Sequence, residues 1–240
     1  GILDEIISRI PENIDTYVEP FLGGGAVMLA VLEKYPNIRI IAGDVNKKLI
    51  NVYYRIVTDC DELVKYLSEL QKDYYVLDMD GKRQMFLDIR NEFNDEKYNE
   101  SVESASWFIF LNKTCFNGLY RENSKGMFNT PFGKAEKPLI CDEKNLRGLN
   151  DLLGRNNVRI QSEEYYRYGK LCDDKTFYYL DPPYRPITNT SAFTTYSKSG
   201  FNDENQMDLK LFCDNINDKG GRFLQSNSYQ ADGFFDDLYR

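Results

Sequence analysis

The stretch "TYVEPFLGGGAVMLAVLEKYPNIRIIAGD", from Thr16 to Asp44, decides the fold. Its aromatic and β-branched start predicts a short strand over 16–21, which runs into three glycines. Residues 26–35 have the apolar content of a buried helix, and the following proline ends it. A second β-branched run, 38–44, ends in an acid. Strand, glycine turn, helix and strand within about thirty residues predict a βαβ unit, which is typical of a parallel sheet covered by helices.

The rest of the chain changes character twice. Residues 46–112 have helical, charged patterns with little strand signal, and 115–134 are rich in turn-forming Gly, Asn and Pro. The α/β rhythm resumes after 139, with a helix near 145–153, strands at 157–161 and 176–180, a helix at 204–216 and a strand at 221–226. We therefore predict an α/β fold: a Rossmann-like sheet, residues 1–53 and 141–240, interrupted by a mainly helical insert, residues 54–140.

Composition narrows the possible chemistry. The 240 residues contain no histidine, which excludes Ser-His-Asp and Cys-His catalysis. The five cysteines lie at least 26 residues apart, so we expect no metal site. We expect their thiols to be reduced, as in a cytoplasm. No apolar run approaches the roughly 20 residues of a membrane span, and no charged-then-apolar leader marks the chain for export.

The net charge of −8 argues against a nucleic-acid partner when it is taken alone. The charge is, however, unevenly distributed along the chain. Between Leu111 and Arg147 seven basic residues face four acidic ones, a net +3, and the remainder of the chain carries −11. This contrast is compatible with a basic patch for nucleic acid, or with a chance fluctuation on a solvated surface.

The glycine-rich turn predicts a ligand site at the start of a helix; the alternative is a tight turn with a structural role only. It departs from the dinucleotide fingerprint, because after Gly23 and Gly25 the third glycine position falls on Met28. Glu19 would repel a phosphate, so it suits a ligand that is cationic or offers amine and hydroxyl donors. Asp44 ends the second strand, where nucleotide sites place the acid that binds ribose hydroxyls; the alternative is an N-cap for the next helix. Together these residues favour an adenosine-bearing ligand.

A second acid ends the buried-looking run "FYYLDPPYRP", Phe177 to Pro186. Asp181 stands at the carboxyl end of a strand, where open α/β sheets bind their ligands. The two prolines that follow have fixed φ and no N–H, so the Pro182 carbonyl is a rigid acceptor. A carboxylate and a fixed carbonyl that converge on one point suit a substrate –NH₂ group. Tyr184 adds a flat face, so the motif suits a planar amine; the alternative is a proline-stiffened strand exit.

"DPPY" together with "EPFLGGGAV" resembles the S-adenosylmethionine-dependent amino methyltransferases of DNA. "FLNKTCFNGLYRENSKGMFNTPFGK" and "TSAFTTYSKSGF" are similar to segments of the Dam-type (D12 class, alpha group) adenine-N6 methyltransferases. The four blocks occur in that family's order and cover most of the chain. The resemblance implies a methyltransferase sheet with an inserted DNA target-recognition domain. It also implies a basic segment and further strands beyond the two ends of the printed sequence.

The resemblance also implies roles for individual residues. The cofactor would be S-adenosylmethionine, with S-adenosylhomocysteine as product, bound by Glu19, Phe21, Gly23, Gly25, Asp44, Glu164, Tyr165 and Asp181. Glu164 would accept from the adenine amino group, with Glu163 as a rival. Asp181 and the Pro182 carbonyl would hold the target N6, and Tyr184 would stack on the flipped base. A Ser/Thr-rich segment, 188–199, would close over the site, or is merely a solvated loop.

Within the insert, the resemblance implies a DNA-binding set. Phe116 and Asn117 resemble residues that wedge into the base stack, and Leu119, Arg121 and Pro131 resemble those that read base edges at GATC. Lys113 and Lys134 join this set as basic neighbours. The implied partner is double-stranded DNA, with a cognate restriction endonuclease as a further expected partner, for a monomeric cytoplasmic enzyme of a bacterium or phage. Two alternatives stay open: another amino acceptor, cytosine N4 or an RNA base, and a non-catalytic DNA-binding remnant.

Overall fold

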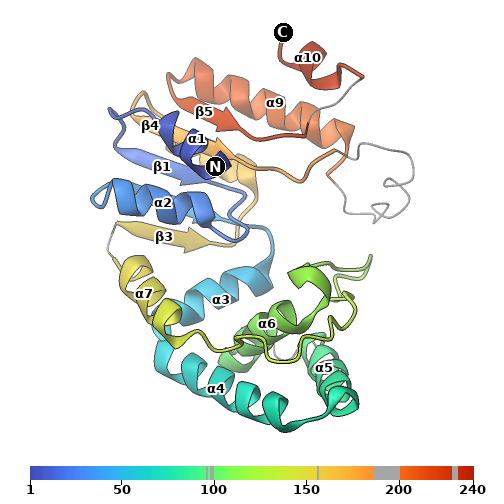
Figure 1. The fold of residues 1–240 in the computed structure, drawn as a ribbon. Helices are drawn as coiled ribbons and strands as arrows, with labels where there is room; N and C mark the ends of the chain where they lie inside the picture. Colours follow the sequence, from blue (N-terminus) through green and yellow to red (C-terminus); the bar gives the residue numbers. More distant parts are fainter. Residues whose placement is uncertain (96, 98–99, 156, 186–200, 229–231) are drawn as a thin grey trace. The chain divides into compact units, whose positions relative to one another are not determined.

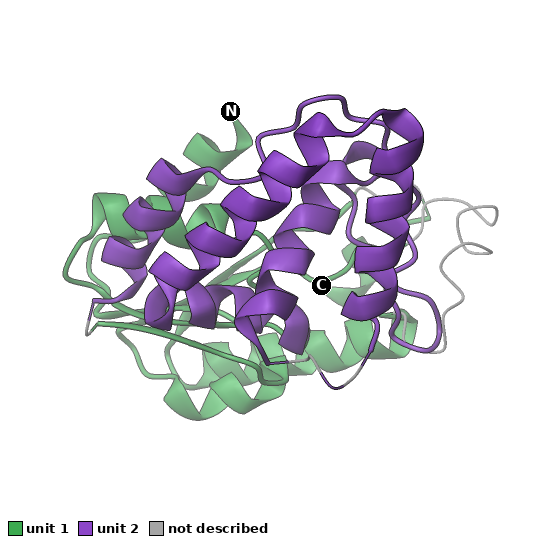
Figure 2. Cartoon of the chain, turned by 90° about the horizontal axis from the view of Figure 1, so that it is seen from below, with its two compact units in different colours: residues 1–45, 156–240 green, residues 46–155 purple. Residues whose placement is uncertain are grey.

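A computed structural model describes residues 1–95, 97, 100–155, 157–185, 201–228 and 232–240 (Figure 1). The chain divides into two compact units. One comprises residues 1–45 and 156–240, and the other comprises residues 46–155 (Figure 2). The predicted domain boundaries, after residues 53 and 140, fall inside the second unit.

The first unit is built on a parallel five-stranded sheet with the strand order β3-β2-β1-β4-β5 (Figure 1). The α/β fold with a parallel sheet is therefore confirmed. The strands are β1 (Thr16–Glu19), β2 (Arg39–Gly43), β3 (Val158–Gln161), β4 (Thr176–Leu180) and β5 (Arg222–Gln225). The helices of this unit are α1 (Ile2–Ser8), α2 (Ala26–Lys34), the 3₁₀ helix η3 (Tyr165–Leu171), α9 (Asp203–Asp218) and α10 (Phe234–Leu238).

The order of the strands in the sheet indicates where a ligand site is expected. The chain steps outward from β1 to β2 and β3, then returns to the other side of β1 with β4, so the direction of winding reverses between β1 and β4. In open α/β sheets ligands bind at such a switch point, outside the carboxyl ends of the strands. The two predicted acids, Glu19 and Asp181, lie at the carboxyl ends of these two strands.

Alternation along the strands divides the side chains between two faces. Val18 of β1 and Tyr178 of β4 belong to a buried cluster with Leu209 and Phe212 of α9 and Tyr168 of η3. Their neighbours in sequence point to the opposite face, where Tyr17 stacks on Phe177 with ring centroids 6.4 Å apart. Glu19 follows on that same face two residues after Tyr17, and Asp181 follows four residues after Phe177.

The second unit is helical. It contains α3 (Lys47–Thr58), α4 (Cys60–Val76), α5 (Met79–Phe93), α6 (Val102–Thr114), the 3₁₀ turn η2 (Phe116–Gly118) and α7 (Glu143–Leu153). Helix α6 packs against α3, α4 and α5. It is apolar around most of its circumference, with Ala105, Phe108, Phe110 and Leu111 buried, as expected of a central helix. None of the described helices is long and apolar enough to cross a membrane.

Candidate active site

The glycine turn follows the carboxyl end of β1 and is hydrogen-bonded to the carboxyl end of β2. Leu22 N–H donates to the Gly43 carbonyl over 2.8 Å, and Gly25 N–H donates back to the Leu22 carbonyl over 2.8 Å. The turn requires φ values of +47° at Gly23 and +68° at Gly25, which L side chains rarely adopt. Gly25 is the N-cap of α2, so this turn delivers the chain directly into the helix.

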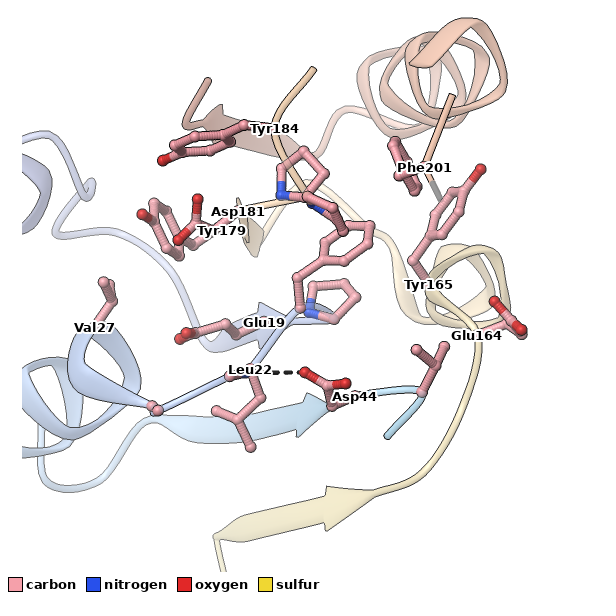
Figure 3. Close-up of a pocket in the computed structure, with 18 of the residues that line it drawn as sticks. Glu19, Leu22, Val27, Asp44, Glu164, Tyr165, Tyr179, Asp181, Tyr184 and Phe201 are labelled. Carbon is pink, nitrogen blue, oxygen red and sulfur yellow. Dashed lines mark hydrogen bonds between the residues drawn. The ribbon is translucent and has the colours of Figure 1, made fainter. Parts of the chain in front are cut away.

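Asp44 is tied to the same turn, because the Gly23 N–H donates to its Oδ2 over 3.0 Å (Figure 3). The alternative prediction, that Asp44 caps the next helix, is wrong. The N-cap of α3 is Asn46, whose side chain accepts from the backbone N–H groups of Lys48 and Leu49. Asp44 instead fixes the glycine turn.

A cavity of about 890 Å³ opens beside this turn. Its wall includes the whole stretch from Glu19 to Val27 and residues 181–184 (Figure 3). Of the acidic residues, Glu19, Asp44, Glu164 and Asp181 contribute to it, and the described lining contains no lysine or arginine. Such a wall repels phosphate groups and attracts cations and donors of hydrogen bonds.

Glu19 is the most buried of these acids, with 2% of its surface exposed. The hydroxyl of Tyr17 donates to its Oε2 over 2.6 Å. Burial raises the pKa of Glu19 from its ordinary 4.5 to about 8; the Tyr17 hydrogen bond and the Met28 N–H lower it, and the nearby Asp181 raises it. The Glu19 carboxyl group is therefore protonated at neutral pH, unless a bound cation stabilises its ionised form and lowers its pKa.

Aromatic side chains form another part of the wall. Phe21 stacks on Tyr165 with centroids 5.4 Å apart and an angle of 26° between the rings, and Phe201 meets Phe21 edge-on at 6.0 Å. Glu164, the N-cap of η3, is exposed at the rim beside Tyr165. Its rival Glu163 is not among the lining residues. Burial first, then Asp208, raises the pKa of Tyr165 to about 12, so this ring stays neutral.

The "DPPY" motif follows directly from β4, all five residues of which are buried. Asp181 itself is exposed and borders the cavity, Pro182 is buried, and Tyr184 is half-exposed. Burial, followed by the hydrogen bond to Asp181, raises the pKa of Tyr184 to about 12. The strand exit therefore presents a carboxylate and a neutral phenol ring to the same space.

The structure thus brings every predicted cofactor-binding and catalytic residue to one cavity. The sequence reasoning missed Tyr179, Phe201 and Asn205. Tyr179 had a signal, since it lies two residues before Asp181 and so on the same face of β4. Phe201 is the last residue of the quoted block "TSAFTTYSKSGF" but was given no role there. Asn205 lies in the first turn of α9, and no local pattern indicates its place in the cavity. The predicted closing segment, 188–199, lies outside the described residues.

Comparison with known proteins decides the family. A model of the D12 class N6 adenine-specific DNA methyltransferases matches residues 1–240. The chain belongs to this family. It is 40% identical to the Type II methyltransferase M.MjaIII of Methanocaldococcus jannaschii over 99% of this chain and 83% of that protein. It is 31% identical to the DNA adenine methylase of Escherichia coli over 94% of this chain and 76% of that protein. The chain is an adenine-specific DNA methyltransferase.

The predicted DNA-binding residues of this methyltransferase all lie in residues 113–134 of the helical unit, and all are exposed. Two antiparallel bridges, Cys115 with Phe132 and Glu122 with Phe128, fold this segment back on itself. Phe116 and Leu119 are 54% and 55% exposed, which is unusual for large apolar side chains. The other members of the set are Lys113, Asn117, Arg121, Pro131 and Lys134.

Backbone hydrogen bonds hold this segment. Phe116 N–H donates to the Pro131 carbonyl over 2.9 Å, and Gly133 N–H donates to the Thr114 carbonyl over 2.8 Å. Asn117 has φ +54°, a left-handed conformation that sharpens the turn after Phe116. The exposed apolar side chain of Phe116 is therefore displayed on a fixed backbone.

Arg121 has a defined orientation within the same segment. Its Nε donates to Asn129 Oδ1 over 3.1 Å, and the Asn129 N–H donates to the Arg121 carbonyl over 3.0 Å. In the part of the chain that the structure describes, the two terminal nitrogens of this guanidinium make no hydrogen bond. They retain the fork geometry that binds paired acceptors.

Among the described residues there is no cluster of three or more acidic or cysteine side chains that could hold a metal ion. All five cysteines are free.

Proposed function

We propose that this methyltransferase transfers a methyl group from S-adenosylmethionine to N6 of an adenine that is swung out of duplex DNA, with GATC as its site. The observation that carries the proposal is that Asp181, Pro182 and Tyr184 border the same cavity as Glu19 and the glycine turn. A site for a planar amine and a site for a cationic cofactor therefore adjoin.

The cavity fits the proposed cofactor. An acidic wall without lysine or arginine suits the sulfonium and ammonium charges, and Glu19 is the buried acid that would face them. Glu19, Phe21, Gly23 and Gly25 would line the methionine end of the cofactor, and Asp44 would bind its ribose. Tyr165 would pack against the adenine ring, and Glu164 would accept a hydrogen bond from the adenine amino group. When bound, S-adenosylmethionine supplies an electrophilic methyl group.

The chain's own residues then position the acceptor. Asp181 and the Pro182 carbonyl would accept the two hydrogens of the target N6 and so fix its lone pair toward the cofactor. As N6 becomes positive, both acceptors stabilise the developing charge, which is the main requirement of an in-line displacement. Tyr184 would stack on the base. No strong general base is needed, in keeping with a sequence that has no histidine.

Extrusion of the base costs a few kcal/mol, since the adenine must leave its pair and its stack. Phe116, exposed on a fixed turn, would fill the gap, and Asn117 would accompany it. Leu119, Arg121 and Pro131 would read base edges, while Lys113 and Lys134 would contact phosphates. Double-stranded DNA is thus the proposed partner of a monomeric cytoplasmic enzyme, and a restriction endonuclease of the same system is a further proposed partner.

The proposal is tested with labelled S-adenosylmethionine and matched duplexes that carry or lack GATC. Label on adenine N6 only in the GATC duplex supports it, whereas label on cytosine N4 or on RNA contradicts the acceptor. DNA binding without label would favour a non-catalytic protein. In the same assay Asp181→Ala should abolish transfer while cofactor binding persists, and transfer at the wild-type rate would overturn the assignment of this site.

A further inference from the structure

The loop after β4 contains two consecutive prolines, Pro182 and Pro183, whose carbonyls differ in their hydrogen bonding. Gln206 Nε2 donates to the Pro183 carbonyl over 3.3 Å. No hydrogen bond to the Pro182 carbonyl is present among the described residues. Because proline has no N–H, this loop has few donors of its own, and the side chain of Gln206 supplies one from α9.

Gln206 is an unusual residue for its position. It lies three residues before Leu209 on the apolar face of α9 and is 0% exposed, whereas glutamine is mostly found on surfaces. Within the described ranges its buried Oε1 has no hydrogen-bond partner, which is a cost that a methionine of similar shape would not carry. Packing alone therefore does not account for a glutamine here, but its donor to Pro183 does.

A second attachment lies one turn earlier on the same helix. Arg185 binds Asp203 through two of its nitrogens, Nε to Oδ1 at 2.7 Å and a terminal nitrogen to Oδ2 at 3.1 Å. Asp203 and Gln206 are three residues apart and so share one face of α9. The first turn of α9 thus holds the loop at Pro183 and at Arg185, on either side of Tyr184.

We propose that Gln206 is a positioning residue for methyl transfer: it engages the Pro183 carbonyl and so orients the stiff loop with the Pro182 carbonyl left for the substrate amine. The inference rests on the proposed function, since it takes Asp181 and Pro182 as the site of that amine. Gln206 touches neither substrate nor cofactor in this scheme. Its loss should slow transfer without weakening cofactor binding.

The test compares two substitutions in the full chain. Gln206→Met keeps the shape and removes the donor, so the single-turnover rate of transfer to a GATC duplex should fall roughly 10-fold or more. The Kd for S-adenosylmethionine, measured by calorimetry, should stay within about twofold, because only the loop is released. Glu204→Gln is the matched control: Glu204 is an exposed residue of the same turn, and its loss should leave both quantities unchanged.

The Gln206→Glu variant tests the role of the donor through the pH dependence of the transfer rate, which a purely structural role of Gln206 would not change. Burial raises the pKa of a carboxyl group, so the protonated acid donates to Pro183 at low pH and the ionised acid does not at high pH. The transfer rate of this variant, divided by that of the wild type, should therefore fall as the pH rises. Wild type and variant share the charged groups near residue 206, which are Asp203 on α9 and Asp181 and Arg185 on the loop. Taking the ratio of the two rates therefore removes the effect of these groups.

Two results overturn the inference: a wild-type transfer rate in Gln206→Met, or a ratio for Gln206→Glu that does not change with pH. If Gln206→Met does not fold, judged by its thermal transition, the pH ratio of Gln206→Glu decides alone. The Asp181→Ala variant separates this inference from the proposed function. If Asp181→Ala is inactive and Gln206→Met is unimpaired, only the role of Gln206 is wrong; if Asp181→Ala is active, the site itself is wrong.

Discussion

The phenolic oxygen of Tyr17 lies 2.6 Å from Oε2 of Glu19, and both side chains are buried at the end of β1. Burial, followed by the charge of Glu19, raises the pKa of Tyr17 well above its usual value, so the phenol remains a donor throughout the range in which Glu19 ionises. This donor stabilises the charged form of Glu19, the form that a cationic ligand requires. Tyr17 therefore influences the cavity without being part of its lining.

We expect Tyr17→Phe to weaken binding of S-adenosylmethionine roughly 10-fold at neutral pH, since a hydrogen bond to a charged group is lost. The pKa of Glu19 should rise further above about 8, so the pH at which binding becomes strong should move upward. Calorimetric titration across a pH series measures both effects.

Tyr178→Phe is the matched control for Tyr17→Phe. Its hydroxyl is also buried and donates over 2.9 Å, to the Tyr168 carbonyl, but it lies on the other face of the sheet. It should leave the pH dependence of cofactor binding unchanged. Equal pH profiles for wild type and Tyr17→Phe would show that the phenol only fills space.

A second prediction concerns stability in the absence of ligand. Folding raises the pKa of Glu19 from 4.5 to about 8, so between these values the folded protein holds a proton that the unfolded chain releases. The stabilisation from this group is fully present below about pH 4.5 and is lost as the pH rises toward 8. Glu19→Gln, which does not titrate, should gain thermal stability relative to wild type over that interval.

Thermal transitions of both proteins at several pH values measure this difference. Asp208→Asn, which removes an exposed carboxylate, is the control and should run parallel to wild type. A difference between Glu19→Gln and wild type that stays constant with pH would contradict the raised pKa.

Most of the fold could be predicted because it depends on local pattern. The apolar run 176–180 ends in Asp181, and the run 38–43 ends in Asp44, so the sequence marks both strand exits. Gln206 could not be placed in this way. Its position on the apolar face of a helix was visible, but its partner Pro183 lies 23 residues earlier and is reached only through the tertiary fold. The Asn46 cap is a local feature, but Asp44 two residues earlier offers the same capping chemistry, so the sequence does not decide between them. The contact that distinguishes Asp44, from the Gly23 N–H, spans 21 residues and is reached only through the fold.

The third prediction concerns Gly43 of β2, where Tyr168 and Gln161 pack closely against the backbone. A Cβ at this position would lie 1.9 Å from the Tyr168 hydroxyl oxygen and 2.4 Å from the Gln161 carbonyl oxygen. Gly43→Ala should cost about 1–3 kcal/mol and lower the thermal transition by several degrees. Adding Tyr168→Phe should restore part of the loss, since it removes one of the two clashes.

Gly148 provides the control for this prediction. It is exposed within α7, and a Cβ there would meet nothing within 4 Å. Gly148→Ala should stabilise the protein by about 0.5–1 kcal/mol, as alanine does in helices. If Gly43→Ala proved as harmless as Gly148→Ala, the packing of Tyr168 on β2 would be wrong.

The fourth prediction tests Phe116 as the residue that fills the gap left by the flipped base. Phe116→Ala should reduce the fluorescence gained by a duplex with 2-aminopurine at the target position, because the vacated stack is no longer held open. Phe116→Trp should retain the gain. Met127→Ala, which truncates another exposed apolar side chain of the same segment, is the control. An undiminished signal in Phe116→Ala would exclude this role.

The last prediction concerns base selection by Arg121. Asn129 binds its Nε and leaves the terminal nitrogens for a bidentate contact, such as that with guanine O6 and N7. Arg121→Ala should reduce discrimination at one base position by roughly 10- to 100-fold, measured as methylation rates on duplexes with single substitutions.

Two further variants separate shape from charge at this position. Arg121→Lys should not restore discrimination, because lysine keeps the charge but not the fork. Lys125→Ala, on the same segment, should weaken binding to all duplexes alike and preserve the preference, as expected for a phosphate contact. If Arg121→Ala weakened all duplexes equally, Arg121 would be a phosphate contact too, and selection of the site would depend on other residues of the segment.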